Sequence, residues 1–248
     1  MMQTLFEHRS IRKYKNTPVN ADLLEKILLA GTRASNTGNM QVYSIIVTQE
    51  PKIRTKLWEV HFKQNMVLEA PVHLTFCADI NRFNQWCQIN NAEPGYDNFL
   101  WFYNATIDAV LASQNVCIEA EKNGLGICYL GTTTYMADKI IDILNLPKGV
   151  VPVTAITLGY PNEEPPLTDR LPLEGVIHYE KYQDYNPEKI TRLYSEKDNS
   201  ELTQKLVSEN QTQNLAQIFT DKRYKKADNI HFSKTFIETL KKQGFMNQ

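Results

Sequence analysis

The sequence has few cysteines and no long apolar run, and both features limit what the protein can be. Its four cysteines, Cys77, Cys87, Cys117 and Cys128, are widely spaced and form no CxxC pair, so we expect no disulfide framework. Every apolar stretch is short and interrupted by polar residues, which excludes a membrane-spanning helix. The first residues contain no basic stretch followed by an apolar run, so we expect no signal peptide and a cytoplasmic protein.

The charge and motif content excludes further classes. The formal net charge is −1 over 248 residues, and nothing in it predicts nucleic-acid binding. The five histidines are scattered without HxH or HExxH spacing, so no metal site is expected. The chain has no GxSxG motif and no cysteine in an activating context, so nucleophilic catalysis lacks support. What remains is a globular protein long enough to bury a sizeable core.

The glycines of Gly124-Leu125-Gly126 superficially resemble part of a dinucleotide-binding fingerprint. They follow a predicted helix and precede a predicted strand, which is the reverse of the order that this fingerprint requires. Gly124 is better explained as the left-handed residue that ends the preceding helix.

Apolar spacing predicts several helices. Asn20 is a plausible N-cap for the first, whose apolar face is formed by Leu23, Leu24, Ile27 and Leu28. Further helices are expected over 52–68, 102–123, 136–144 and 233–243. We expect the helix over 102–123 to be central, because apolar groups occupy much of its circumference. Its 3–4 spacing is carried by Ile107, Val110, Leu111, Gln114, Cys117, Ile118 and Glu121.

Short β-rich runs predict the strands. They lie at 42–47, 72–78, 126–131 and 151–159. Residues 79–98 show little periodicity and are interpreted as a loop or surface excursion, and the chain from about 187 is polar with weaker helical signals. The strands are too few for a doubly wound sheet, so the sequence favours an α+β layer fold around a central helix.

Two polar segments flank the first helix. The segment 8–14 (HRSIRKY) places Arg9 and Arg12 three residues apart, so that both guanidinium groups can converge on one phosphate. The segment 34–41 (ASNTGNMQ) offers amide and hydroxyl groups to the polar edge of a ring. Each has an ordinary explanation too, since exposed arginines near a terminus are usually solvated and polar runs after helices are usually loops.

Taken together and in order, these segments resemble the FMN-dependent nitroreductase family, in particular its branch of NADPH-linked nitroreductases (oxygen-insensitive nitroreductase A-like) and flavin reductases. The resemblance spans nearly the whole chain and is weakest over 187–230. The matching stretches are HRSIRKY at 8–14, ASNTGNMQ at 34–41, GLGICYLG at 124–131, VPVTAITLGYP at 151–161 and DRLPLEGVIHYEKYQDY at 169–185.

The resemblance implies a nitroreductase-like fold, with a mostly antiparallel central sheet flanked by helices. It also implies a homodimer with tightly bound FMN at the subunit interface. In this picture residues 1–186 form the FMN-binding core, and 187–248 form an extension that packs on the partner subunit.

The resemblance further implies which residues contact the cofactor. His8, Arg9, Ser10 and Arg12 would hold the phosphate and the ribityl chain, and Arg170 would complete the phosphate clamp. The residues expected near the isoalloxazine ring are Asn36, Gln41, Gln64, Asn65, Met66, Tyr129, Leu130, Gly131 and Thr132. Of these, Gly131 would allow a close approach of the backbone.

One position departs from the family pattern, and one basic cluster has two interpretations. The branch often has a lysine two residues before the arginine of the clamp, and this chain has Thr168 there, which could loosen FMN. A basic cluster, Lys222, Arg223, Lys225 and Lys226, could meet the 2′-phosphate of NADPH or could equally be a solvated helix face.

The implied activity is hydride transfer from NADPH or NADH through FMN to nitroaromatics, quinones or free flavin, by a ping-pong mechanism. The chemistry belongs to the cofactor, so no catalytic side chain is named. The alternatives are a non-catalytic FMN-binding or storage protein, and another enzyme of the same fold that uses reduced FMN.

Overall fold

The computed structural model describes residues 3–248 and divides them into two compact units. The first contains the chain up to Pro166 together with Phe232–Gln248, and the second contains Leu167–His231. Helix α11 (Lys226–Gln243) begins in the second unit and ends in the first.

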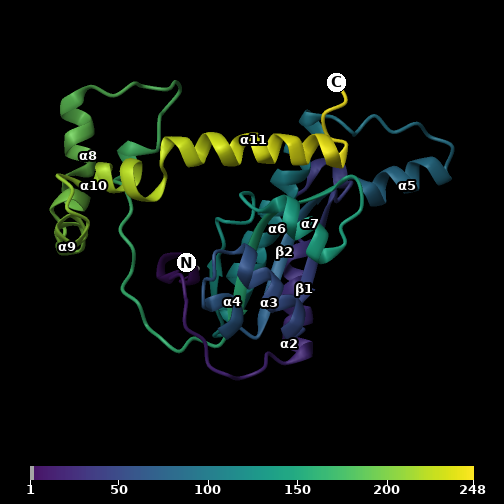
Figure 1. The fold of residues 1–248 in the computed structure, drawn as a ribbon, viewed down its shortest axis with the longest axis horizontal. Helices are drawn as coiled ribbons and strands as arrows, with labels where there is room; N and C mark the ends of the chain where they lie inside the picture. The colour runs from purple at the N-terminus through teal and green to yellow at the C-terminus, as the bar shows by residue number, and fades with distance from the viewer. Residues whose placement is uncertain (1–2) are drawn as a thin grey trace. The chain divides into compact units, whose positions relative to one another are not determined.

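An antiparallel sheet of four strands is formed within the described residues, in the order β1-β2-β4-β3 (Figure 1). The strands are β1 (Tyr43–Thr48), β2 (Val72–Asp79), β3 (Gly126–Tyr129) and β4 (Val150–Gly159). In the register, Ile45 lies opposite Phe76 and Cys128 lies opposite Thr157. The predicted strands are confirmed to within two residues at each end, as is the α+β class with its antiparallel sheet.

The helices and helical turns of the first unit surround this sheet. In chain order they are α1 (Thr4–Glu7), α2 (Ala21–Thr32), η1 (Thr37–Asn39), α3 (Pro51–Val60), α4 (Met66–Glu69), α5 (Asn81–Ile89), α6 (Phe99–Lys122) and α7 (Ala137–Leu144). Asn20 caps α2 as predicted, because its Oδ1 accepts from the backbone N–H groups of Asp22 (2.9 Å) and Leu23 (3.2 Å). Gly124, at φ +77°, follows the end of α6 in the left-handed conformation that was predicted.

Helix α6 is central as predicted, although most of the residues that carry its 3–4 spacing stay partly or largely exposed. Ile107, Val110 and Leu111 are 41, 44 and 42% exposed. The buried positions are mostly small: Phe102, Ala105, Asp108, Ala109, Ala112, Ser113, Val116, Cys117 and Ala120. The small residues allow the helix to approach the sheet and α2 closely, whereas apolar spacing alone points to the larger side chains.

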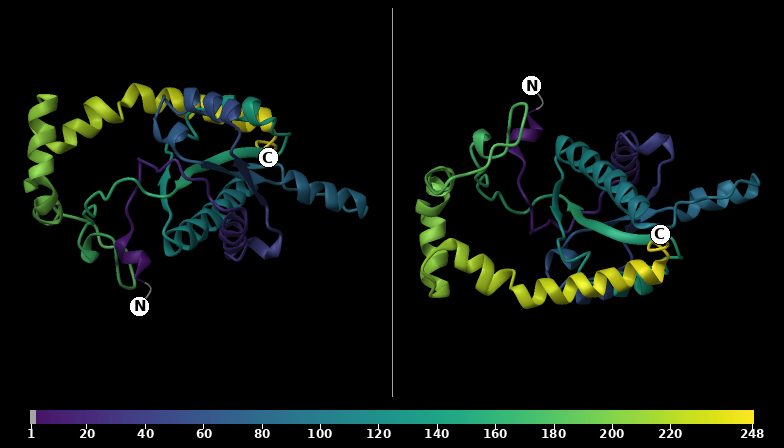
Figure 2. Two further views of the ribbon diagram at one scale, coloured as in Figure 1. Left: turned by 90° about the horizontal axis from the view of Figure 1, so that it is seen from below. Right: turned by 90° about the horizontal axis from the view of Figure 1, so that it is seen from above.

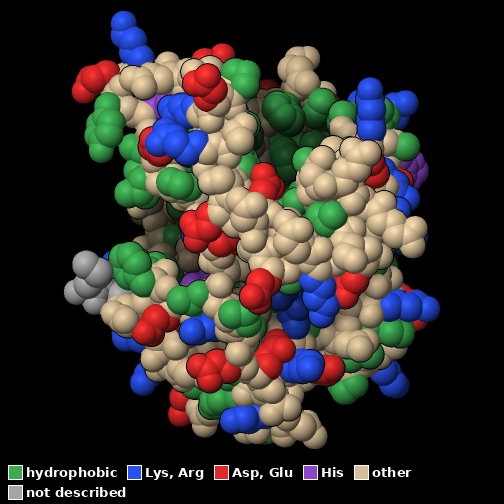
Figure 3. Space-filling model, turned by 90° about the vertical axis from the view of Figure 1, so that its left-hand side faces the viewer, with side chains coloured by type: hydrophobic (Ala, Val, Ile, Leu, Met, Phe, Trp, Pro, Cys, Tyr) green, Lys and Arg blue, Asp and Glu red, His purple; other side chains and the backbone are tan. Residues whose placement is uncertain are grey.

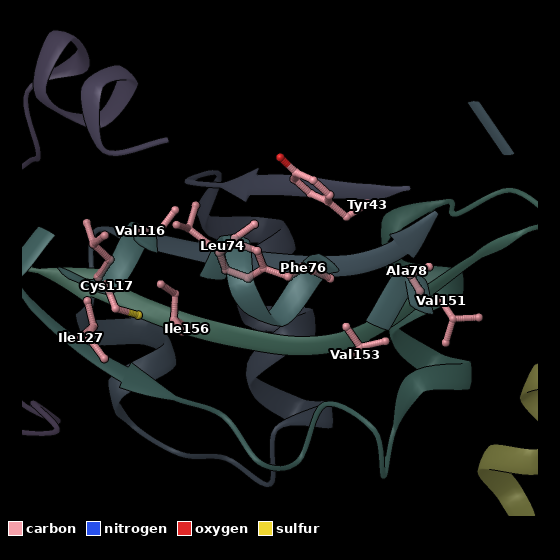
Figure 4. Close-up of a cluster of buried hydrophobic side chains, with 14 of the residues drawn as sticks. Tyr43, Leu74, Phe76, Ala78, Val116, Cys117, Ile127, Val151, Val153 and Ile156 are labelled. Atoms are coloured by element: carbon pink, nitrogen blue, oxygen red, sulfur yellow. The ribbon is translucent and has the colours of Figure 1, made fainter. Parts of the chain in front are cut away.

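The contact between α2 and α6 shows how close this approach is (Figure 2). A Cβ added to Gly31 of α2 would lie 2.6 Å from Cγ2 of Val116 and 3.3 Å from the carbonyl oxygen of Ala112. The side chain of Asn115 donates to the carbonyl oxygen of Ala30 (3.3 Å), which also joins the two helices. In the core of the sheet, the side chains interdigitate, with Leu74, Phe76 and Ile156 fully buried (Figure 4).

Two of the expected segments differ in the structure. The expected helix over 52–68 is interrupted after Val60, because Phe62 and Lys63 both adopt φ +56°, and α4 restarts at Met66. The expected loop over 79–98 contains α5, whose start is capped by Asp79 Oδ1 accepting from the backbone N–H of Asn81 (2.9 Å). Ile80, Phe83 and Cys87 follow one another at helical spacing and pack on or near the core, a short apolar pattern that the loop interpretation overlooked.

The end of the chain returns to the core of the first unit. Phe245 is fully buried, and its ring centroid lies 5.4 Å from that of Phe102. Gln243 Nε2 donates to the carbonyl oxygen of Val150 (3.1 Å). Residues 232–248 therefore belong structurally with the sheet.

The second unit is more helical than the weak signals from residue 187 onward indicate. It contains η2 (Leu173–Gly175), α8 (Pro187–Asn199), α9 (Glu201–Asn210), α10 (Leu215–Gln217), the π-helical turn η3 (Ile218–Arg223) and the start of α11. Within it, Lys197 Nζ pairs with Asp169 Oδ2 at 2.6 Å. Lys and Arg side chains are interspersed with Asp and Glu on the face drawn in Figure 3. Among residues 3–248, no helix has the length and apolar content needed to cross a membrane.

Candidate flavin site

The predicted phosphate segment runs beside the edge strand β3. Ser10 forms an isolated parallel bridge with Ile127, and the backbone N–H of Ile11 donates to the carbonyl oxygen of Ile127 (2.8 Å). Ile11 is 5% exposed and packs directly over Gly126, where an added Cβ would lie 2.5 Å from Cγ1 of Ile11. Ile11 thus anchors the segment in the core, between the partly exposed Ser10 and the exposed Arg12.

Two carboxylates hold the same segment from distant parts of the sequence. Glu163 Oε1 accepts from the backbone N–H groups of Arg12 (2.5 Å) and Lys13 (3.0 Å). Glu121 Oε1 lies 2.6 Å from Nδ1 of His8. Burial raises the pKa of Glu121, and the contact with His8 opposes that rise.

Arg9 borders an acidic cleft of about 280 Å³ that Glu7, Glu121, Glu163 and Glu164 also line. Its Nη1 donates to the carbonyl oxygen of Glu7 (3.2 Å), while its buried Nε has no hydrogen-bond partner among the described residues. The carboxylates make the cleft itself unfavourable for an anion. An anion bound by Arg9 therefore requires this guanidinium group to point away from the cleft.

The break between α3 and α4 positions Gln64. Its Nε2 donates to the carbonyl oxygen of His61 (3.0 Å) and lies 3.4 Å from Oγ1 of Thr132. Asn65, which is exposed, begins the next turn, and Met66 beside it is 5% exposed and belongs to the core. The left-handed residues that ended the helix early therefore bring Gln64 to the loop after β3.

That loop carries the other predicted ring contacts. Leu130 is buried and its N–H donates to the carbonyl oxygen of Ala155 (2.8 Å), while Gly131 is exposed and a Cβ added there would meet no protein atom within 4 Å. The hydroxyl of Tyr129 lies 2.9 Å from Oγ of Ser113 and donates to Oε1 of Gln114 (3.3 Å). Burial raises the pKa of Tyr129.

Two buried imidazoles lie behind Gln64 and Thr132. The ring centroids of His61 and His73 are 5.3 Å apart, and both residues are fully buried. Burial lowers the pKa of His61 to about 4 and that of His73 to about 3, so both rings are neutral at pH 7. Nδ1 of His61 lies 2.7 Å from Oγ1 of Thr132, and Nε2 of each ring has no hydrogen-bond partner within residues 3–248.

The segment 34–41 is attached to α6. Thr37 donates to Oδ1 of the buried Asp108 from its backbone N–H (2.9 Å) and from its hydroxyl (3.1 Å). Asn36 Oδ1 accepts from the backbone N–H of Gln41 (3.2 Å), which is left-handed at φ +53°. The Gln41 side chain is exposed beside a cleft of about 610 Å³ that Arg82 also borders.

Arg170 and the basic cluster lie in the second unit. Arg170 is exposed, and its Nη1 donates to the carbonyl oxygens of Thr168 (3.2 Å) and Asp169 (2.9 Å). Lys222, Lys225 and Lys226 are exposed as well. Arg223, also exposed, lies with its guanidinium carbon 5.8 Å from the centroid of the Phe219 ring.

Three of the predicted segments are thus brought together: the Ser10–Ile127 bridge joins 8–12 to β3, and the Gln64–Thr132 contact joins 64–66 to the loop that follows β3. The residues that hold these segments and segment 34–41 were not identified from the sequence: Glu121, Glu163, Asp108 and His61. Their partners lie 113, 151 and 71 residues away for the first three, and 71 away for the fourth. No local pattern connects residues at such separations.

Comparison with known proteins points the same way as the geometry. Residues 5–160 match the model of the nitroreductase family. An NADPH-dependent oxidoreductase of Staphylococcus epidermidis is 30% identical over 249 residues, which cover 98% of this chain and 96% of that protein. A crystal structure from Bacteroides fragilis superposes with a TM-score of 0.97 at 48% identity, covering 99% of this chain and 100% of the other. The NADPH:FMN oxidoreductase of Vibrio harveyi, solved with NAD+, superposes with a TM-score of 0.83 at 25% identity over 100% and 99% of the two chains.

Proposed function

Because the chain belongs to the nitroreductase family, we propose that it is an NAD(P)H-dependent oxidoreductase that uses FMN to reduce small aromatic or quinoid acceptors. The observation that carries the proposal is the convergence of 8–12, 64–66 and 129–132 at β3 and the loop after it. The buried, unpartnered Nε of Arg9 and the open space over Gly131 both fit a bound group with an anionic end and a flat ring.

The residues divide between the two ends of the cofactor. His8, Arg9, Ser10 and Arg12 would hold the phosphate and the ribityl chain, and Arg170 would add a further cation. The ring would be held by Asn36, Gln41, Gln64, Asn65, Met66, Tyr129, Leu130, Gly131 and Thr132. When bound, FMN supplies the capacity to accept a hydride from NAD(P)H and pass two electrons on.

One open site serves donor and acceptor in turn. Residues 129–132 would line one face of the flavin, and the nicotinamide would stack on the opposite, exposed face. After NAD(P)+ departs, a nitroaromatic, quinone or free flavin would use the same space. Parallel lines in a double-reciprocal plot are the kinetic signature of such a ping-pong sequence. Water would supply the protons for the reduced acceptor, so the mechanism needs no general acid among the side chains.

We expect the active form to be a homodimer. Ile107, Val110 and Leu111 leave apolar surface exposed on α6, the helix that also holds segment 34–41 through Asp108. A second copy covering this surface would bring 34–41 into an interface, where Asn36 and Gln41 could contribute to a shared site. The extension over 187–248 would pack on the partner, apart from the contacts that 232–248 make with their own sheet.

The test is spectroscopic. Purified protein should show the flavin absorption bands, and these should bleach on anaerobic addition of NADPH or NADH, faster with one nucleotide. Reoxidation by a quinone or nitroaromatic completes the assignment. A protein that carries FMN but is reduced by neither nucleotide would be a binding or storage protein. A colourless protein that stays colourless with added FMN would refute the flavin assignment.

The preference between the two nucleotides can be tested separately. If the basic cluster meets the 2′-phosphate, Lys222→Gln together with Arg223→Gln should raise KM for NADPH and leave KM for NADH unchanged. Equal effects on both, or none, would mean that the cluster is a solvated helix face.

A further inference from the structure

The buried histidine His61 has a position that the proposed activity does not by itself explain. It ends α3, contacts Thr132 through Nδ1 (2.7 Å), and its carbonyl oxygen accepts from Gln64 (3.0 Å). It therefore touches two residues of the proposed ring site while being fully buried behind them. We propose that His61 is a positioning residue, which fixes the hydroxyl of Thr132 as a hydrogen-bond donor to the polar edge of the flavin; this inference rests on the proposed function.

The surroundings of the His61 ring determine its tautomer. A neutral imidazole carries its proton on one nitrogen and accepts at the other. Nε2 is buried without a partner among the described residues, whereas Nδ1 faces the Thr132 hydroxyl. A buried N–H donor without an acceptor is rarer and more costly than an unused acceptor. The proton should therefore reside on Nδ1 and be donated to Thr132.

The hydroxyl of Thr132 is constrained in turn. A hydroxyl has one hydrogen to donate and two lone pairs with which it accepts. Here one lone pair accepts from Nδ1 of His61, and the other faces Nε2 of Gln64 at 3.4 Å. With both lone pairs engaged, the hydrogen is left to be donated outside the network. Thr132 is partly exposed, so that donor is available to a bound group.

The chemical consequence is a preference for the reduced cofactor. Reduction places negative charge on the pyrimidine end of the flavin, and a hydrogen bond to a charged acceptor is stronger than one to a neutral acceptor. A hydroxyl that can only donate should thus stabilise the reduced form more than the oxidised form. A hydroxyl that rotates freely could donate its hydrogen to a neighbouring protein acceptor and leave the flavin without this hydrogen bond.

His73 provides a matched control for this role. It is the other ring of the same buried pair, and its Nδ1 lies 3.4 Å from Oγ1 of Thr75. Replacing either ring by phenylalanine keeps an aromatic group in the pair and removes the nitrogens. Only His61→Phe also removes a contact with Thr132.

The experiment measures the midpoint potential and the FMN dissociation constant of the full-length holoprotein. We expect His61→Phe and Thr132→Val to lower the equilibrium constant for reduction of bound FMN about tenfold. His73→Phe should leave it within about twofold of the wild type. His61→Asn, whose amide nitrogen can occupy the position of Nδ1, should recover most of the loss. Equal potentials in His61→Phe and His73→Phe would overturn the proposal.

A second measurement does not depend on redox chemistry. Nitrogen-15 NMR of the histidine side chains should show His61 protonated at Nδ1, and a proton at Nε2 would overturn the proposal. If His61→Phe does not fold, the NMR measurement on the wild type decides the result, since it needs no substitution. A wild type that binds no FMN would refute the proposed function, while the NMR result would still report on the His61–Thr132 contact.

Discussion

The two ends of the proposed flavin site are built from different kinds of interaction. Segment 8–12 is held by the carboxylates of Glu121 and Glu163 and lies against an edge strand, with Arg12 exposed. The ring end is held by neutral groups, in which His61, Gln64 and Thr132 contact one another beside the protein core.

This difference predicts different sensitivities. Interactions among exposed charges weaken as salt is added, whereas buried neutral hydrogen bonds do not. Buried imidazoles, in turn, respond to acid, because protonation would place a charge in the core. The phosphate end should therefore be sensitive to salt and charge, and the ring end to acid and side-chain shape. Four perturbations would break or sharpen that contrast, from the largest expected effect to the smallest.

Acid should destabilise the protein through the buried histidine pair. With folded pKa values of about 4 for His61 and 3 for His73, the unfolded state binds protons first as the pH falls below about 6.5. Stability from these groups is complete above that pH and declines as the pH falls toward 4 and 3. At pH 5 the proton uptake of each imidazole in the unfolded state should lower the free energy of unfolding by on the order of 2 kcal/mol.

Urea unfolding of the wild type and of His73→Phe at pH 8 and pH 5 checks this. The variant should lose less stability between the two pH values than the wild type. Arg54, the charged neighbour that contributes to the lowered pKa of His73, is present in both proteins. An identical loss in both would show that His73 is not the source.

Replacing both arginines of the phosphate segment should weaken FMN binding strongly. Arg9→Gln with Arg12→Gln removes two charged donors, and we expect the dissociation constant to rise about 100-fold. Titration of FMN fluorescence at low and high salt measures it. The wild type should lose affinity as salt rises, and the double variant should lose much less. Arg33→Gln, at the exposed C-cap of α2, is the matched control and should bind like the wild type.

Gly126→Ala should damage the phosphate end through packing alone. The new methyl group would collide with Ile11, so the protein should lose about 2 kcal/mol of stability as the segment shifts. FMN affinity should fall with it, although no charge has changed. Thermal unfolding and FMN titration measure the two effects. Unchanged stability would mean that segment 8–12 moves away from β3 without cost.

Gly131→Ala should lower FMN affinity without lowering stability. The added methyl group meets no protein atom within 4 Å, so stability should stay within about 0.5 kcal/mol of the wild type. If a ring lies against this backbone, FMN affinity should fall about tenfold, which corresponds to about 1.4 kcal/mol. The same unfolding and titration experiments measure both. Wild-type affinity in this variant would remove Gly131 from the ring contacts.

Local sequence patterns predicted much of the fold. The β-rich runs, the Asn20 cap and the Gly124 terminus all depend on near neighbours, and each is where the sequence places it. The central position of α6 was predicted, but its buried residues could not be told from the apolar spacing, because burial there is decided by how closely the sheet and Gly31 approach. Helix α5 was missed because its apolar positions, Ile80, Phe83 and Cys87, are few and lie in an otherwise polar stretch.

The candidate site divides in the same way. Its motifs are contiguous and could be found by resemblance, and two contacts then join three of them in space. The residues that hold these motifs in place could not be found by resemblance. Glu163 recognises backbone N–H groups, which every residue but proline has, so its partners leave no trace in sequence. In the sequence His61 is one of five scattered histidines. Its contact with Thr132 arises because the chain reverses at Phe62 and Lys63.

The division of α6 into a small buried face and a larger exposed one has a consequence for how the protein should be handled. If a second copy covers Ile107, Val110 and Leu111, association and cofactor retention become linked equilibria. Dilution would then release FMN from a protein whose intrinsic site is unchanged, and added FMN would favour association. The apparent affinity for flavin would depend on the concentration of the protein itself, so that a weak value measured in dilute solution would report on the helix surface and not on the pocket.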